Sequence, residues 1–312
     1  MSSRHLVDPE LLPLLDMWPT LTLTHENLAA MRARELPLPP ADPAGTTLER
    51  LSVPGPEGAP EIGLHIYTPE GATGSLPCVY HIHGGGYVGG AAKDLEFIHR
   101  PLVRDLGCVL VSVDYRLAPE TRFPGAIEDC YAGLAWTFGH VAELGVDPNR
   151  IGVMGESAGG GLAAALALLA RDRGEFPLAF QHLIYPMIDD RTCIAEPNPV
   201  TGAFVWNAAS NAFGWGALLG VKPGSEGVSP YAAAGRAENL AGLPPAFLST
   251  GSLDLFVDED IAYAQRLIRA GVPTELHVFP GSFHGYDIAP GARVSAAARD
   301  ASRAALKRFL FG

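Results

Sequence analysis

The sequence predicts an α/β fold, in which helices cover both faces of a mostly parallel central sheet. From about residue 49 onward, short β-rich runs alternate with longer helical patterns, which is typical of parallel strands joined by crossover helices. The 312 residues are 47% hydrophobic and only 18% charged, so a sizeable core can form. No Ser/Gly linker or charge run divides the chain. We therefore expect a single domain over residues 1–312.

Eight runs have the length and composition of strands. They lie at 49–54, 61–69, 77–85, 108–115, 150–156, 180–186, 245–251 and 274–280. The run 108–115 is apolar on both faces, as a central parallel strand should be. In the run 61–69, Ile62, Leu64 and Ile66 alternate with other residues, which predicts a strand with one exposed face. A mixed sheet with a parallel centre follows.

Five stretches have helical patterns, and several of them end at a glycine, as helices often do. They lie near 94–106, 123–140, 158–171, 257–271 and 293–310. Residues 1–45 and about 189–234 interrupt the alternation, and we expect them to form a helical cap added to the core. Four aromatic residues of the second segment either line a pocket or pack the cap onto the core. They are Phe204, Trp206, Phe213 and Trp215.

The charge and the cysteine content of the chain limit the kinds of binding partner and the cellular compartment that we expect. With 22 Lys and Arg against 34 Asp and Glu, the net charge of -12 disfavours nucleic acid and stable membrane association. Asp8, Pro9 and Pro13 interrupt the first apolar residues, which predicts no signal peptide and a cytoplasmic protein. The four cysteines lack metal-site spacing, so we expect free thiols and no bound metal. They are Cys78, Cys108, Cys130 and Cys193.

The run 150–156 leads into a turn that has the pattern of a nucleophile elbow. Gly155-Glu156-Ser157-Ala158-Gly159 separates an apolar strand from an Ala/Leu-rich helix, and this context distinguishes the pattern from a simple glycine turn. Ser157 would stand at the helix N-terminus, where unpaired amides and the helix dipole suit an oxyanion. Ser157 is therefore the candidate nucleophile, and the amide of Ala158 is a candidate oxyanion donor.

A glycine run at 83–87 follows another predicted strand. The amides of Gly85 and Gly86 can approach a substrate carbonyl because no side chain obstructs them, and Tyr87 beside them is a candidate pocket residue. The alternative, a phosphate-binding loop, lacks the G-x-G-x-x-G order and a prompt helix. His81 and His83 alternate on this strand and could hold a metal, but no third ligand has an obvious spacing.

A nucleophilic serine needs a base and an acid, and in α/β folds with a nucleophile elbow both of them follow the serine along the chain. His284 lies between glycines on a loop after the last predicted strand, whereas His277 lies within that strand. Asp254 is the acidic residue closest to the end of the preceding strand. Further acidic residues more naturally begin the next helix, whose first turn favours carboxylates. They are Asp258, Glu259 and Asp260.

These motifs identify a resemblance that covers nearly the whole chain. They are HGGGY at 83–87, DYRLAPE at 114–120, FPGAIEDCYAGLAW at 123–136, GESAGGGLA at 155–163, DLFVDE at 254–259 and FHGY at 283–286. The sequence resembles the bacterial hormone-sensitive-lipase-like esterases, a branch of the α/β-hydrolases. The resemblance implies an α/β-hydrolase fold, a cap over the site, the same triad, and the same three oxyanion donors. Two positions depart from the family pattern: Glu156, where Asp or Thr is usual, and Phe256, where Leu is common.

The resulting hypothesis is a serine carboxylesterase that hydrolyses short-to-medium acyl esters through an acyl-enzyme intermediate. The substrate is a small-molecule ester, and the mechanism requires no metal or organic cofactor. Amide, carbamate or lactone hydrolysis on the same triad is the alternative. A non-catalytic small-molecule receptor is a further alternative, against which the retention of His284 argues. A homodimer is among the arrangements that the sequence leaves open.

Overall fold

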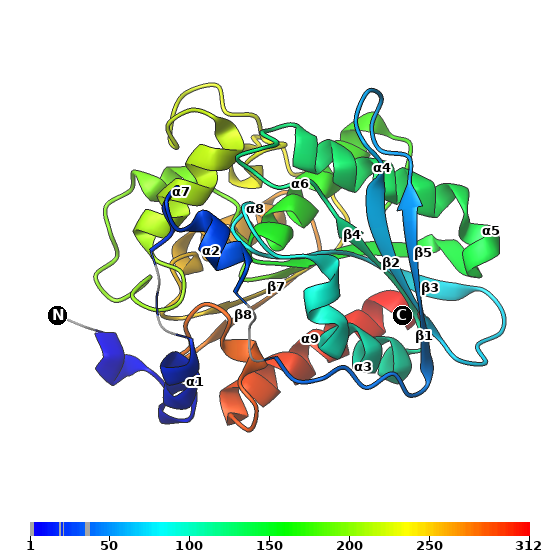
Figure 1. The fold of residues 1–312 in the computed structure, drawn as a ribbon, viewed down its shortest axis with the longest axis horizontal. Coiled ribbons are helices and arrows are strands. Elements are labelled where there is room, and N and C mark those ends of the chain that lie inside the picture. The colour runs from blue at the N-terminus through cyan, green and yellow to red at the C-terminus, as the bar shows by residue number, and fades with distance from the viewer. Residues whose placement is uncertain (1–2, 19, 21, 35–37) are drawn as a thin grey trace.

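The structure is a computed structural model that describes residues 3–18, 20, 22–34 and 38–312. Its centre is an eight-stranded sheet with the order β1-β2-β4-β3-β5-β6-β7-β8 (Figure 1). The strands are β1 (Thr46–Val53), β2 (Ile62–Pro69), β3 (Leu76–Ile82), β4 (Val109–Asp114), β5 (Val146–Glu156), β6 (Gln181–Ile184), β7 (Ala246–Gly251) and β8 (Thr274–Phe279). All eight predicted runs form strands of this sheet.

The sheet is mostly parallel, as predicted. β2 runs antiparallel to both β1 and β4, whereas the neighbours from β4 through β3, β5, β6 and β7 to β8 are parallel. The prediction that β2 exposes one face was wrong. β2 lies inside the sheet between β1 and β4, and α3 packs on the face from which His65 and Tyr67 project.

Helices cover both faces of the sheet. They are α1 (Leu12–Met17), α2 (Leu28–Arg32), α3 (Glu96–Leu106), α4 (Gly125–Gly139), α5 (Val141–Leu144), α6 (Ala158–Arg173), α7 (Ala208–Leu219), α8 (Val257–Arg269) and α9 (Arg293–Phe311). α4, α6 and α8 pack with one buried cluster of side chains, and α3 and α9 pack with the other (Figure 1). All five predicted helical stretches are present.

α6 lies deepest in the molecule because its sequence permits contact on every side. Its residues from Ala158 to Ala170 are alanine, glycine and leucine, and all of them are buried. Small side chains let the helix approach both the sheet and α4 closely, since no bulky group holds the backbones apart. This helix begins directly after Ser157, so the core of the molecule fixes the position of that serine.

The two segments that interrupt the strand–helix alternation lie side by side. The amide of Leu23 donates to Ser210 Oγ at 3.0 Å, and Asn207 Nδ2 donates to Thr22 Oγ1 at 3.1 Å. α2 and α7 are consequently neighbours above the carboxyl ends of the strands (Figure 1). None of the helices in the described part of the chain has the length and apolar character needed to cross a membrane.

Candidate active site

Ser157 occupies a strained turn between β5 and α6. Its backbone has φ 56° and ψ −124°, which non-glycine residues adopt only when the surroundings enforce it. The flanking glycines make the turn possible: a Cβ on Gly155 would lie 2.3 Å from the carbonyl oxygen of Gly159, and one on Gly159 would lie 2.1 Å from that of Ile82. The sequence pattern of an elbow therefore corresponds to a real backbone constraint.

Ser157, His284 and Asp254 form a continuous hydrogen-bonded chain. Ser157 Oγ lies 2.8 Å from His284 Nε2, and His284 Nδ1 lies 2.8 Å from Asp254 Oδ2. Asp254 is fully buried, and its other carboxylate oxygen accepts the amide of Phe256 at 3.0 Å. The carboxylate thus holds one ring nitrogen of the imidazole and leaves the other directed at the serine hydroxyl.

The competing acidic residues are engaged elsewhere. Glu259 Oε1 accepts the amide of Ile188 at 2.8 Å, and Asp258 is exposed and accepts from Asn198 Nδ2 at 3.1 Å. Asp260 is buried within α8, where burial raises the pKa of its carboxyl above the ordinary range. His277 lies on the edge strand β8 and pairs with Glu275. The structure brings none of these groups to Ser157.

The glycine loop after β3 faces the same serine. Gly85 has φ 121° and Gly86 has φ 61°, so the loop depends on backbone conformations that L side chains rarely adopt. Among the described residues, no hydrogen bond occupies the amides of Gly85, Gly86 or Ala158. Three unpaired N–H groups at the start of a helix and in a glycine loop suit a negatively charged oxygen.

Glu156 links the elbow to this loop, a connection that the sequence did not reveal. Its Oε1 accepts the amide of Gly84 at 2.8 Å, and its Oε2 lies 2.9 Å from His81 Nε2. His81 Nδ1 lies 3.0 Å from Ser112 Oγ on β4. Glu156, one of the two departures from the family pattern, lies directly before Ser157, and its side chain therefore connects this turn to Gly84 at the start of the glycine loop.

The two histidines considered for a metal have other partners. His81 is held by Glu156 and Ser112, whereas His83 Nδ1 lies 2.8 Å from the carbonyl oxygen of Gly84. The His83 ring stacks on Tyr115 with the ring centroids 4.3 Å apart. Burial lowers the pKa of His83, so its ring is neutral at neutral pH. Both histidines therefore shape the glycine loop.

Two aromatic rings hold the imidazole of His284. Phe256 packs edge-on at 5.3 Å between centroids, and Tyr185 packs edge-on at 4.8 Å. Tyr185 OH donates to Asp287 Oδ1 at 2.7 Å, which fixes the ring relative to the turn after His284. Phe256, the second departure from the family pattern, therefore packs directly against the candidate base.

A pocket of about 380 Å³ opens over Ser157 and His284. Of the five aromatic residues predicted to line it, only Trp206 does so. Its indole also covers the oxyanion loop, since a Cβ on Gly86 would lie 2.2 Å from Trp206 Cη2. Trp206 Nε1 donates to Asn211 Oδ1 at 3.3 Å, which fixes the ring above the glycine.

The other four aromatic residues are not in the pocket lining, and the prediction needs correction there. Trp215 is fully buried and packs on Tyr87 with centroids 5.0 Å apart. Tyr87 OH donates to the carbonyl of Met187 at 2.7 Å, which turns that ring into the core. Phe204 packs on Phe283, and Phe213 packs edge-on against His25. Phe204 and Trp215 thus pack the second added segment onto the core, and Phe213 packs it against the N-terminal segment.

The N-terminal segment supplies pocket residues that the sequence analysis did not name individually. Leu28, Met31 and Arg32 line the pocket. Arg32 Nε donates to the carbonyl of Val88 at 2.6 Å, and its guanidinium pairs with Glu120 at 2.8 Å. One arginine thus connects α2 with the chain that follows Gly86. α2 has only five residues, so the sequence contains no periodic pattern long enough to mark the face that lines the pocket.

The sheet order, the strained elbow and the serine–histidine–carboxylate chain define an α/β hydrolase. A family model described as alpha/beta hydrolase fold matches residues 79–288. The chain belongs to this family, in its hormone-sensitive-lipase-like group.

Similar proteins extend over nearly the whole length of the chain. Carboxylesterase NlhH of Mycobacterium tuberculosis is 36% identical over 308 residues, which cover 97% of this chain and 96% of that protein. Esterase LipI of the same species is 37% identical over 289 residues, covering 90% and 88%. A solved structure of a bacterial heroin esterase is 39% identical, with a TM-score of 0.90 and complete coverage of both chains.

Proposed function

We propose that Ser157, His284 and Asp254 are the catalytic triad of a serine esterase. The observation that carries this proposal is the chain of two 2.8 Å hydrogen bonds from the serine hydroxyl to the buried carboxylate. The protein is a carboxylic ester hydrolase, and its similarity to proteins named carboxylesterase and esterase favours esters over amides, carbamates and lactones. The intact triad argues against a non-catalytic receptor.

The geometry supports a two-step reaction. Ser157 Oγ attacks the ester carbonyl carbon while His284 Nε2 accepts the hydroxyl proton, and Asp254 stabilises the imidazolium. The amides of Gly85, Gly86 and Ala158 stabilise the tetrahedral oxyanion. His284 then delivers its proton to the alcohol oxygen as the carbon–oxygen bond breaks. A water molecule, deprotonated by His284, attacks the acyl-enzyme and releases the acid.

The size of the pocket favours short-to-medium acyl groups. A volume of about 380 Å³ is at the lower end of the range for drug-sized ligands. We propose that the N-terminal segment and residues 189–234 form the cap of this pocket, because Leu28 and Trp206 of these segments line it. Butyrate and hexanoate esters should therefore be hydrolysed much faster than palmitate esters.

The cysteines support a cytoplasmic location. All four are free, and three of them are buried, as is common in a reducing compartment. Burial raises the pKa of Cys108 and Cys193 to about 12, so these thiols are unreactive at neutral pH. A homodimer stays a prediction, which analytical ultracentrifugation of the purified protein tests.

The decisive experiment replaces the nucleophile. Ser157→Ala should lower kcat on p-nitrophenyl butyrate by more than about 10⁴-fold, because members of a triad act as a unit. A serine-directed organophosphate should add to the peptide containing Ser157, as detected by mass spectrometry. Ser225→Ala, which removes a hydroxyl bonded only to a nearby carbonyl, is the matched control. Full activity of Ser157→Ala would contradict the proposed mechanism.

A further inference from the structure

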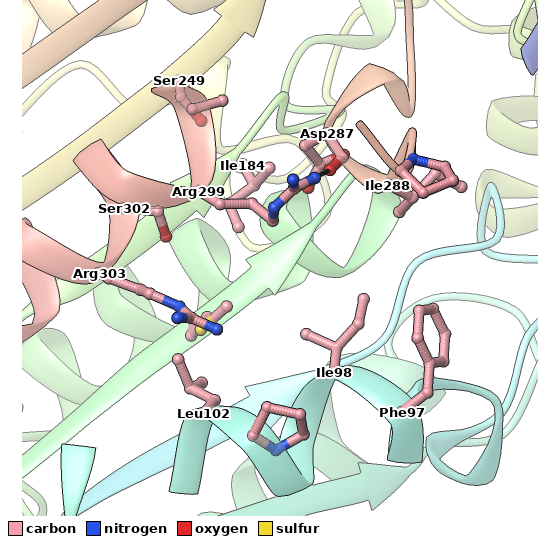
Figure 2. A pocket seen from close by; sticks show the side chains of 14 residues that line it. Phe97, Ile98, Leu102, Ile184, Ser249, Asp287, Ile288, Arg299, Ser302 and Arg303 are labelled. Atoms are coloured by element: carbon pink, nitrogen blue, oxygen red, sulfur yellow. Dashed lines mark hydrogen bonds between the residues drawn. The ribbon is translucent and has the colours of Figure 1, made fainter. Parts of the chain in front are cut away.

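A second cavity adjoins the catalytic pocket and has no role in the mechanism above. It has a volume of about 310 Å³ and lies between α3 and α9, below the turn that follows His284 (Figure 2). Phe97 and Ile288 line both this cavity and the catalytic pocket. The two spaces therefore share a wall made of two partly exposed apolar side chains.

The walls of this cavity combine apolar surface with positive charge. Ile98 and Leu102 of α3 face the side chains of α9 across the space (Figure 2). From α9, the guanidinium groups of Arg299 and Arg303 project into it. Both side chains are only partly buried, so an anion bound there would meet positive charge without either arginine being fully desolvated.

The arginines retain capacity for an anion. Arg303 Nη1 pairs with Asp105 at 3.0 Å, and both side chains are about two-fifths exposed. Arg299 Nη1 donates to the backbone carbonyls of Asp287 and Ala289, and no carboxylate of the described residues forms an ion pair with it. Each guanidinium carries five N–H donors, so both can bind a further oxygen acceptor.

The carboxyl of Asp287 is a second negative group beside the two arginines, after Asp105. It lines the cavity but accepts the hydroxyl of Tyr185 at 2.7 Å, so it is directed toward the catalytic side. Burial raises the pKa of Asp287. Asp105 and Asp287 thus offset the two arginines in charge, and the site for an anion consists of the guanidinium N–H donors that these contacts leave free.

We propose that this cavity is a second subsite, which binds the distal carboxylate of an ester substrate whose chain passes between Phe97 and Ile288. This inference rests on the proposed esterase function. An apolar chain would contact the α3 wall, and Arg303 and Arg299 would bind the carboxylate at its end. The carboxylate could belong to the acid part or to the alcohol part of the ester, and the chemistry at the arginines is the same for both.

The test compares substrates that differ only in the distal charge. For the acid part, mono-p-nitrophenyl esters of dicarboxylic acids from succinic to sebacic are compared with uncharged acyl esters of equal length. For the alcohol part, the butyrate ester of 6-hydroxyhexanoic acid is compared with hexyl butyrate. In one of the two series, kcat/KM for the charged substrate should equal or exceed that for the uncharged one at a single best length.

Substitutions then test whether the preference for the charged substrate arises in the second cavity. Arg303→Gln should reduce the charged-to-uncharged ratio about tenfold, as loss of a charge-assisted hydrogen bond does, with p-nitrophenyl butyrate turnover unchanged. Arg299→Lys retains the positive charge but loses the planar set of guanidinium N–H donors, so it should reduce the charged-to-uncharged ratio less. Ala298→Phe should abolish the preference by filling the cavity, since Ala298 lines it. Lys307→Gln on the exposed side of the same helix is the matched control.

The outcomes separate this inference from the proposed function. If p-nitrophenyl butyrate is hydrolysed and neither series responds to Arg303→Gln and Arg299→Lys, the subsite is wrong and the esterase function stands. If Lys307→Gln lowers the charged-to-uncharged ratio as much as Arg303→Gln does, the effect comes from the overall charge of the protein, and the subsite is wrong. Absence of butyrate hydrolysis by the unmodified protein would instead contradict the proposed function itself.

Discussion

The carboxylate of Glu156 accepts the amide of Gly84 at 2.8 Å, so the residue before Ser157 holds the residue before the two glycines that we propose as oxyanion donors. The second carboxylate oxygen is anchored on His81 at 2.9 Å. This link between the elbow and the glycine loop keeps the proposed oxyanion donors in a fixed position relative to Ser157. Such preorganisation is the usual source of electrostatic stabilisation in acyl transfer.

Breaking this link should impair chemistry more than substrate binding. Glu156→Ala should lower kcat on p-nitrophenyl butyrate by about 10- to 100-fold with a smaller change in KM, since losing an oxyanion donor outright costs about 10²–10³. Glu156→Gln should retain most activity, because its amide oxygen can still accept from Gly84. Steady-state kinetics of both variants, with exposed Glu143→Ala as control, checks this prediction. Equal activity of all three variants would contradict it.

The acid of the triad should be identifiable by a matched pair of substitutions. Asp254→Asn should lower kcat by about 10³- to 10⁴-fold, because an amide favours the wrong imidazole tautomer. Asp258→Asn should have little effect, since its side chain is exposed and bonded to Asn198. Both variants keep the shape of the residue, and circular dichroism should show unchanged folds. A larger loss in Asp258→Asn would reassign the acid.

Buried histidines should make stability depend on pH. His99 is 1% exposed, and among the described residues neither ring nitrogen has a hydrogen-bond partner. Burial lowers the pKa of His99 well below its usual value, with smaller contributions from the neighbouring histidines. Below about pH 6.5 the unfolded chain therefore binds a proton that the folded chain excludes, so the free energy of unfolding falls as the pH falls.

Removing the imidazole should weaken this dependence. Between about pH 7.5 and about pH 5.5, the stability lost through one such histidine is about 1.4 kcal/mol. His99→Phe should lose correspondingly less stability over this range than the unmodified protein, as measured by urea unfolding at both values. Burial raises the pKa of Glu259 and Asp260. These two carboxyls therefore increase the free energy of unfolding as the pH falls, but they do so equally in both proteins. The same loss in both would show that His99 is protonated in the folded state.

The sequence predicted the sheet and pointed to the three residues of the proposed triad, because both follow from local patterns. The strand runs are apolar at the positions that the sheet buries, and the glycines around Ser157 are required by the backbone of the turn itself. The pocket lining could not be predicted in the same way. Trp206 and Trp215 lie nine residues apart in similar surroundings, yet one lines the pocket and the other fills the core. Which of the two rings lines the pocket depends on how α7 packs, and this packing is a tertiary property.

The contact between Glu156 and Gly84 escaped the sequence analysis for a related reason. The two residues are 72 positions apart, and they meet only because β3 and β5 are neighbours in the sheet. The sequence of a single strand does not indicate which strands will be its neighbours in a parallel sheet. The second cavity could not be predicted either, since α3 and α9 are far apart in the sequence and come together only on one face of the sheet.

The last prediction separates pocket lining from core packing. Trp206→Ala should enlarge the pocket and move the best acyl chain to a longer ester, because each methylene buried adds about 0.8 kcal/mol, or about fourfold in kcat/KM. Trp215→Phe should leave the best length unchanged, since its ring contacts Tyr87 in the core. The measurement is kcat/KM for p-nitrophenyl acetate through palmitate. Acetate hydrolysis reports whether removing the indole above Gly86 also disturbs the oxyanion loop. An unchanged profile in Trp206→Ala would mean that another wall limits the acyl chain.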